Sequence, residues 1–141
     1  MIEIKLLTPT DFHILNQVAE DVFDDPIVES SAQEFLADPR HRLVVALDND
    51  LVVGFVSAVI YLHPDKPTPE LWINEIGVAP THQRQRIGKA LMQTILDIAG
   101  QSGCTEAWVL TDRTNLPAMA MYKSAGGEET LPDPTMFAFK L

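Results

Sequence analysis

Hydrophobic residues recur along this chain with two periods, one typical of strands and the other of helices. Six segments have the alternation or the short apolar run of a β-strand: 2–6, 43–47, 51–61, 71–78, 107–111 and 136–141. The turn sequence Asp48-Asn49-Asp50 lies between the second and third segments and predicts a β-hairpin there.

Four segments are predicted to be helices: 12–22, 30–37, 87–99 and 116–124, of which 12–22 has helical spacing of its apolar residues and 87–99 is strongly amphipathic. Thr8 and Asp11 offer caps for the first helix, and Ser31 with Glu34 predicts a capping box at the start of the second. The third helix is the most regular, because one stripe carries Ile87, Leu91, Ile95 and Ile98. This order of elements predicts a single domain, residues 1–141, with a mixed α/β sheet packed by helices.

Composition and charge narrow the class of protein. The 141 residues are 46% hydrophobic, which is enough for a core that needs no metal or disulfide to stabilise it. The single cysteine, Cys104, excludes an internal disulfide. We expect it to be a buried structural thiol. The formal net charge of -10 argues against nucleic-acid or anionic-membrane partners, because their phosphates would be repelled. Neither a secretory leader nor a membrane-spanning run is recognisable, so we expect a cytoplasmic protein.

The most informative segment is 74–92, which has the pattern of a strand, a polar loop and a helix start. Its loop and first helical turn carry Arg84, Arg86 and Lys89, and no acidic residue accompanies them. A helix N-terminus adds free N–H groups and partial positive charge, and Gly88 would let an anion come close. We therefore predict a phosphate or pyrophosphate site, with a solvated basic turn as the alternative. Neither a Walker P-loop nor a dinucleotide fingerprint occurs.

Two motifs resemble those of the GNAT N-acetyltransferases. After a strand and Val78-x-Pro80, the run Gln83-x-x-Arg86-x-Gly88-Lys89-Ala90-Leu91 is similar to the family's acetyl-CoA signature, Q/R-x-x-G-x-G/A. Further on, Asn115-x-x-Ala118-x-x-x-Tyr122-x-x-x-Gly126 is similar to a second family helix. The resemblance covers nearly the whole chain. It implies the GNAT acyl-CoA N-acyltransferase fold, an α/β (α+β) fold whose mixed, mostly antiparallel sheet has about six to seven strands flanked by about four helices.

Within the family, the chain looks closest to short acidic members that acetylate the 3-amino group of aminoglycosides. This narrower resemblance rests on the strand Glu75-Ile76-Gly77-Val78, the turn 82–86, the helix end 122–126 and the C-terminal segment 136–139. Two residues depart from the family pattern. Arg86 stands where the family has its first glycine, and we expect it to keep an ordinary helical φ. Gly127 stands where a large apolar residue is common, which puts the sheet contact near the end of the Tyr122 helix in doubt.

The resemblance implies direct attack of a primary amine on the thioester of acetyl-CoA. The amine must first lose a proton, and Glu75, on the strand before the phosphate turn, is the candidate general base. The structural alternative is a Glu75 carboxylate paired with a neighbouring side chain. Tyr122 is the candidate general acid for the departing thiolate; alternatively it positions the sulfur or simply packs half-buried.

The resemblance also implies where coenzyme A lies. Backbone groups of Ile76, Gly77 and Val78 are expected to bond the pantetheine arm as an added strand would. Asn115 is expected to cap its helix or to contact the pantetheine, next to Tyr122. The phosphates are expected at the residues of the basic turn: Gln83, Arg84, Gln85, Arg86, Ile87, Gly88 and Lys89.

The acidic residues are concentrated in one segment. Six acids and no base lie from Glu20 to Glu34, where the family has its acceptor site. This concentration predicts attraction of a cationic amine, with acidic surface for solubility as the alternative. The candidate acceptor-binding residues are Asp21, Asp24, Asp25 and Glu29.

The sequence thus predicts an acetyl-CoA-dependent N-acetyltransferase of a small, cationic, aminoglycoside-like amine. Two alternatives stay open: the same enzyme class acting on a polyamine, an amino-acid derivative or a protein amine, and a non-catalytic acyl-CoA-binding module. A homodimer is compatible with the family. The four histidines lack metal-ligand spacing, so no metal site is expected. Trp72 and Trp108 are expected in the core or on a sheet face.

Overall fold

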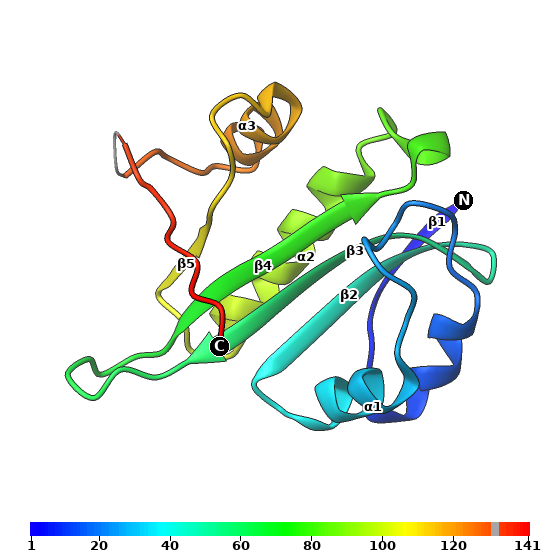
Figure 1. Cartoon of the computed structure of the whole chain (residues 1–141), viewed down its shortest axis with the longest axis horizontal. Coiled ribbons are helices and arrows are strands. Elements are labelled where there is room, and N and C mark those ends of the chain that lie inside the picture. The colour runs from blue at the N-terminus through cyan, green and yellow to red at the C-terminus, as the bar shows by residue number, and fades with distance from the viewer. Residues whose placement is uncertain (131–132) are drawn as a thin grey trace.

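A five-stranded mixed sheet is the centre of the computed structural model, which describes residues 1–130 and 133–141 (Figure 1). Its strands, in spatial order, are β1 (Ile2–Leu6), β2 (His41–Asp48), β3 (Leu51–Tyr61), β4 (Glu70–Val78) and β5 (Glu106–Val109). The pairings β1–β2, β2–β3 and β3–β4 are antiparallel, and β5 runs parallel to β4. The predicted mixed sheet is confirmed, with five strands in the described residues instead of six to seven.

Besides the sheet, the described residues form three α-helices and two 3-10 helices: α1 (Glu29–Ala37), α2 (Ile87–Gln101), α3 (Leu116–Ser124), η1 (Pro9–Asn16) and η2 (Pro80–His82). The apolar stripe predicted for α2 is buried at Ile87, Leu91 and Ile95, and this helix lies along one face of the sheet, behind β4 in Figure 1. Among the described residues, no helix is both long enough and apolar enough to cross a membrane.

Two glycines on neighbouring strands identify the two faces of the sheet. A Cβ on Gly54 of β3 would meet side chains of Ile87 and Leu91, so this position faces α2. A Cβ on Gly77 of β4 would lie 2.6 Å from the Val22 carbonyl oxygen. Since successive strand residues point to opposite faces, Gly77, which pairs with the residue after Gly54, belongs to the face away from α2. We call this second surface the open face.

The helix expected over 12–22 is wrong beyond Asn16. Residues 17–19 instead lie beside β3, where Val52 donates its N–H to the Gln17 carbonyl and accepts one from Ala19, both at 2.9 Å. This edge of β3 is free at that point because β4 ends its pairing at Gly54. Strand-type hydrogen bonds to a distant segment have replaced the local helix.

The capping box expected from Ser31 is also wrong. Helix α1 begins at Glu29 with Val28 as its N-cap, so Ser31 already lies inside the first turn. The predicted caps of the first helix are confirmed, because the Thr8 N–H and hydroxyl both donate to the Asp11 carboxylate at 2.9 Å.

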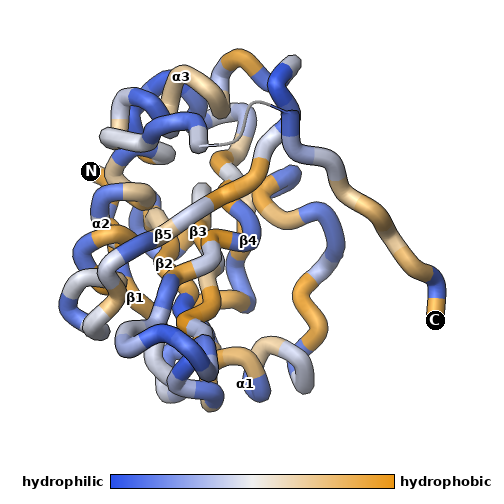
Figure 2. The backbone as a smooth tube through the Cα atoms, turned by 90° about the vertical axis from the view of Figure 1, so that its left-hand side faces the viewer, coloured by the Kyte–Doolittle hydropathy of each residue, from blue (hydrophilic) through white to orange (hydrophobic). Residues whose placement is uncertain are grey.

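The final strand expected over 136–141 does not form. Residues 133–141 have no strand assignment and extend away from the rest of the molecule (Figure 2). Their apolar side chains are exposed, with Phe137 at 79% and Phe139 at 84%. Alternating apolar residues make a strand only beside a strand partner, and no neighbouring strand pairs with this segment.

A buried carboxylate joins β3, β4 and the loop between them at one end of the open face. Glu70 is 8% exposed and accepts hydrogen bonds from the Tyr61 hydroxyl at 2.7 Å and from Lys66 Nζ at 3.2 Å. His63 Nε2 lies 2.8 Å from the same carboxylate. These donors, Tyr61 first, lower the pKa of Glu70 to about 2.

This pKa predicts a specific acid sensitivity. The folded-state pKa lies below the ordinary value of 4.5, so the Glu70 contribution to stability is present at neutral pH and is lost as the pH falls from about 4.5 through about 2. Glu70→Gln should therefore be less stable than the parent chain at pH 7, and the difference should vanish near pH 2. Urea unfolding at a series of pH values measures it. Glu3→Gln, at an exposed carboxylate on β1, is the control, and parallel pH profiles for the parent and Glu70→Gln would contradict the assignment.

Candidate functional site

Strand β4 has a neighbour on both sides over only half of its length. It pairs with β3 from Glu70 to Val78, whereas its pairing with β5 stops at Ile73, opposite Val109. Beyond that point β5 diverges and the backbone of residues 74–78 has one edge without a strand. Such an edge can hydrogen-bond an extended ligand, as predicted for the pantetheine arm at Ile76, Gly77 and Val78.

The polar loop after β4 contains two residues in the left-handed backbone region. Arg84 has a φ of 64° and Arg86, the N-cap of α2, has a φ of 63°. The ordinary helical φ expected for Arg86 is therefore wrong: this arginine adopts the conformation for which glycine is favoured. A bulky residue held in this region stores strain, which is typical of turns that serve a ligand.

The N-terminus of α2 has the features of an anion site. The first helical hydrogen bond runs from the Ala90 N–H to the Arg86 carbonyl, so the N–H groups of the three intervening residues precede the ladder. The first turn contains no acidic residue, and within residues 1–130 and 133–141 the basic side chains of Arg84, Arg86 and Lys89 form no ion pair. A phosphate placed here would meet free donors and unneutralised cations.

Gly88, in the first turn of α2, is not required by packing within the chain. A Cβ at this position would meet only Met121 of α3, at an ordinary 3.8 Å. The space over Gly88 is therefore available, as expected if a ligand approaches the backbone there.

Side-chain contacts hold the loop in place. His82 Nε2 lies 2.8 Å from the Asp48 carboxylate, at the end of the β2–β3 hairpin, and His82 Nδ1 lies 2.8 Å from the Thr81 hydroxyl. Gln83 Nε2 donates to the Val78 carbonyl at 3.3 Å, which links the loop back to the end of β4. Gln83 thus has a structural contact that its motif position alone did not indicate.

Glu75 lies on the open face of β4 and is exposed to solvent. It pairs with Ser57, two residues from the Phe55–Gly77 pair, so its side chain shares the face of Gly77. In the part of the chain that the structure describes, Glu75 makes no hydrogen bond or ion pair, which disfavours the structural alternative of a paired carboxylate. The group stands beside the unpaired edge with its oxygens free.

Tyr122 lies on α3, whose two ends are both capped. Asn115 is the N-cap, and its Oδ1 accepts from the Ala118 N–H at 3.2 Å, so the expected capping is confirmed. At the other end, the Gly127 N–H donates to the Tyr122 carbonyl at 2.9 Å and Gly126 has a φ of 96°. This is a Schellman motif, and a Cβ on Gly127 would lie 3.0 Å from that carbonyl oxygen, which explains why a large residue is absent there.

The phenol of Tyr122 is half-buried. Burial raises its pKa above the ordinary 10, so it carries its proton at neutral pH. The phenol can therefore donate a hydrogen bond to a thioester sulfur. It transfers its proton completely only to a thiolate that is more basic than the phenolate of Tyr122. A cavity of about 360 Å³ separates α3 from β5, with Tyr122 and Trp108 in its lining.

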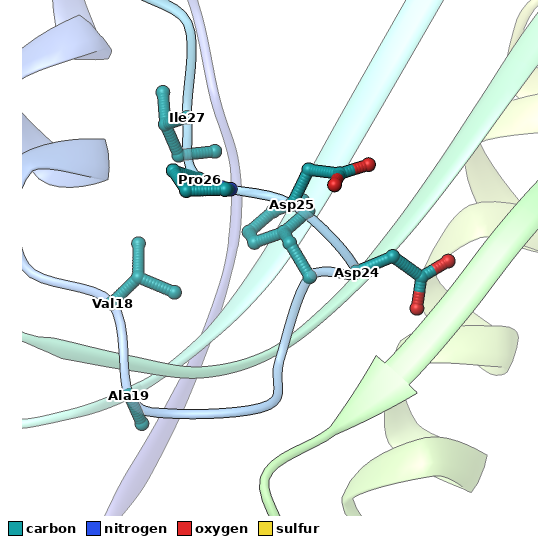
Figure 3. Close-up of a pocket in the computed structure, with 7 residues that line it drawn as sticks. Val18, Ala19, Asp24, Asp25, Pro26 and Ile27 are labelled. Carbon is teal, nitrogen blue, oxygen red and sulfur yellow. The ribbon is translucent and has the colours of Figure 1, made fainter.

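The acidic segment, residues 20–34, contacts the end of β4 that leads into the basic loop. Its backbone touches the sheet through the Val22 carbonyl at Gly77, and Phe23 stacks on Phe55 with ring centroids 4.0 Å apart. Gly77 therefore has the close backbone approach expected of it, and the neighbour in that space is the chain itself. The next residues, Asp24 and Asp25, direct both carboxylates away from the apolar lining of a cavity of about 270 Å³ (Figure 3).

Asp21 and Glu29, the other acceptor candidates, are also exposed and lie before and after this pair in the same segment. Asp21 has a φ of 59°, and Glu29 is the first residue of α1. A second cavity of about 370 Å³, between η1 and α1, includes Glu29 in its lining. The structure therefore does not place all four acids in one pocket.

Comparison with known proteins agrees with this architecture. The profile of the acetyltransferase (GNAT) family matches residues 9–126. The chain belongs to the GNAT family. An N-acetyltransferase 8 of Homo sapiens is 36% identical over 98 residues, which are 70% of this chain and 43% of that protein. A streptothricin acetyltransferase of Streptomyces lavendulae is 35% identical over 98 residues, 70% of this chain and 49% of that protein.

The chain therefore spans less than half of the length of these two relatives. An N-alpha-acetyltransferase RimI of Mycobacterium tuberculosis is matched more fully, with 32% identity over 127 residues, 89% of this chain and 77% of that protein. Among solved structures, an aminoglycoside acetyltransferase from an uncultured soil metagenomic sample, in complex with trehalose, has a TM-score of 0.83. Its sequence identity is 23%, with 99% of this chain and 96% of that chain covered, so this likeness shows the fold.

In this GNAT chain the structure places part of the predicted set around the end of β4, whereas Asn115 and Tyr122 belong to α3 and the four acids do not share one pocket. The open edge, the basic loop and Glu75 all belong to β4 or to the turn after it, and the acidic segment contacts Gly77. The sequence prediction missed the contact between His82 and Asp48 and the side-chain network of Tyr61, Glu70 and Trp108. Both are long-range pairings, and a single sequence carries no signal for them beyond the alternation of the strands.

Cys104 does not add a nucleophile to the site. Burial raises the pKa of the Cys104 thiol, which disfavours the nucleophilic thiolate. Within the described ranges, no group of three His, Cys, Asp or Glu side chains is arranged to hold a metal ion.

The left-handed φ at Arg86 predicts an unusual response to substitution. Arg86→Gly should be about 1 kcal/mol more stable than Arg86→Ala, because both remove the same charge and only alanine keeps a Cβ in the left-handed region. Denaturant unfolding of the two variants measures the difference. Equal stabilities would contradict a left-handed residue at this N-cap.

Proposed function

We propose that this GNAT chain transfers the acetyl group of acetyl-CoA to a primary amine of a small cationic acceptor of aminoglycoside-like chemistry. The observation that carries the proposal is the divergence of β5 from β4 at Ile73, directly before Glu75 and the basic loop. One short stretch of chain thus combines an open strand edge, a free carboxylate and an anion site.

The residues fit the pyrophosphate and the pantetheine arm of acetyl-CoA. The pyrophosphate would be held by the first N–H groups of α2 and by Arg84, Arg86 and Lys89, which have no internal partner among the described residues. The pantetheine amides would bond the backbone of Ile76–Val78. Bound acetyl-CoA supplies the activated acyl group, which the amine attacks directly.

Glu75 would prepare the acceptor. An alkyl ammonium with a pKa of about 10 is almost wholly protonated at neutral pH, so the nucleophile must first be deprotonated. The Glu75 carboxylate, exposed on the open face and without a partner in the described part of the chain, can accept this proton directly or through one water.

Tyr122 and the open edge would stabilise the changing charges. A backbone N–H of the 76–78 stretch can donate to the thioester oxygen as negative charge develops on it. The protonated Tyr122 phenol can donate to the sulfur as the bond to carbon breaks. Because burial raises the pKa of Tyr122, a lowered phenol pKa does not assist this transfer, and hydrogen bonding to the sulfur is the role that fits.

Two substitutions test these roles. Glu75→Gln should lower kcat/KM by about 10²- to 10⁴-fold and leave acetyl-CoA affinity within about twofold, because it removes only the base. Tyr122→Phe should lower kcat by about tenfold or more, with the same small effect on affinity. Thiol release measures turnover and calorimetric titration measures binding.

The outcomes separate the parts of the proposal. If acetyl-CoA does not bind the parent chain, the enzyme assignment is wrong. Binding without turnover of any amine would favour the non-catalytic acyl-CoA-binding alternative. If both variants turn over as the parent does, the two catalytic assignments fail while the enzyme class stands.

Neutralising the acidic segment tests the acceptor class. Asp24→Asn with Asp25→Asn should raise KM for a cationic acceptor about 2- to 10-fold at low salt, with kcat unchanged and the effect reduced in high salt. Glu3→Gln with Asp97→Asn changes the net charge equally at exposed positions on β1 and α2, and should leave KM unchanged. Equal KM values for the two double variants would return the acidic segment to a solubility role.

A protein amine is the second candidate acceptor. It is favoured by the likeness to the N-alpha-acetyltransferase RimI of Mycobacterium tuberculosis, which extends over 89% of this chain. A thiol-release screen that includes sisomicin, spermidine and peptides with free N-termini distinguishes the candidates. Turnover of the peptides alone would overturn the aminoglycoside-like assignment.

A further inference from the structure

A stacked pair of tryptophans lies on the open face of the sheet. Trp72 of β4 and Trp108 of β5 are directly paired in the strand register, and their rings lie 4.8 Å apart at an angle of 12°. Trp108 covers one face of the Trp72 indole, yet Trp72 remains 38% exposed. A large aromatic side chain that is held by a stack but left open to solvent is not explained by core packing.

The pair shares its face with Glu75. On β3, Ser57 pairs with Glu75 and Val59 pairs with Trp72, and residues two apart on a strand point to the same face. This arrangement depends on a β-bulge opposite Ser57 and Ala58, where Asn74 is the extra residue of β4. Without the bulge, Trp72 and Glu75 would point to opposite faces, because they are three residues apart.

Tyr61 and Glu70 fix the orientation of the Trp108 side chain. Its indole N–H donates to the Tyr61 hydroxyl at 2.6 Å, and that hydroxyl donates to the buried Glu70 carboxylate at 2.7 Å. The Tyr61 ring also meets Trp108 edge to face, with centroids 6.2 Å apart. Trp72 therefore packs on a side chain that is already immobilised, and the pair offers a preorganised surface.

We infer that the Trp72–Trp108 pair is an acceptor subsite for a saturated ring that carries ammonium groups, beside the ring whose amine reacts. This inference rests on the proposed function. The electron-rich face of an indole attracts cations and the polarised C–H groups beside them. Trp72 and Glu75 are three positions apart along β4, roughly 10 Å, which matches a neighbouring ring rather than the reacting amine itself.

The chain carries an internal reporter for this subsite. It contains two tryptophans, and both belong to the pair. Binding of sisomicin, a ring-bearing polyamine, in the presence of CoA should therefore change the intrinsic fluorescence directly. Spermidine, a linear polyamine, should change it little at equal site occupancy.

Substitution of Trp72 provides the kinetic test. Trp72→Leu should raise KM for sisomicin about 5- to 10-fold with kcat within about twofold, and should leave KM for spermidine unchanged. Trp72→Phe should restore most of the sisomicin affinity. Leu51→Ala is the matched control, because Leu51 is 37% exposed and lies at the opposite end of β3.

Each outcome supports or overturns one assignment. Absence of turnover with every amine would overturn the proposed function and the subsite with it. Turnover in which Trp72→Leu changes the KM of both polyamines equally, or of neither, would overturn the subsite alone. A change of tryptophan emission in the variant Phe137→Ser/Phe139→Ser would show that the chain's own C-terminal segment covers the pair, which would also overturn it.

Discussion

The structure depends on the limited pairing between β4 and β5. Only four residues of each strand pair, after which β5 leaves the sheet while β4 continues beside β3. The backbone of residues 74–78 is therefore rigidly held on one side and open on the other. In the chain, the basic loop and the N-terminus of α2 follow β4, and Tyr122 on α3 follows β5, so these groups lie on the segments that leave the two diverging strands.

Two irregularities of β4 decide which side chains accompany this open edge. The bulge at Asn74 changes the phase of the strand, so that Glu75 points to the same face as Trp72. Three residues after the bulge, Gly77 provides the space that the Val22 carbonyl occupies, which brings the acidic segment against the sheet. A regular strand with a side chain at residue 77 would separate the carboxylate from the tryptophan pair and would displace the acidic segment.

Local patterns in the sequence predicted much of this arrangement. The hairpin strand 51–61 and the helix 116–124 agree with β3 and α3, because turn or breaker residues mark both ends of each. The failures are long-range. The neighbours of Val18 form hydrogen bonds with Val52 instead of continuing a helix. The segment 136–141 has strand alternation but pairs with no strand of the described sheet. The bulge at Asn74 was equally invisible, since it exists only in the register between two strands.

Arg86 shows how far a motif can predict a site. The family pattern placed it at a glycine position, but the pattern alone did not fix its φ, which depends on how the loop enters α2. The observed left-handed conformation keeps the backbone path of a glycine and adds a cation at the helix N-terminus.

The acidic segment and the basic loop bring opposite charges to the same end of β4. If the acids of the 20–34 segment neutralised Arg84, Arg86 or Lys89, ion pairs would join them, and in the described residues none does. In the proposed function the bases act on an anionic cofactor and the acids on a cationic acceptor, and screening over about 8 Å at physiological salt limits the influence of each set on the other's ligand.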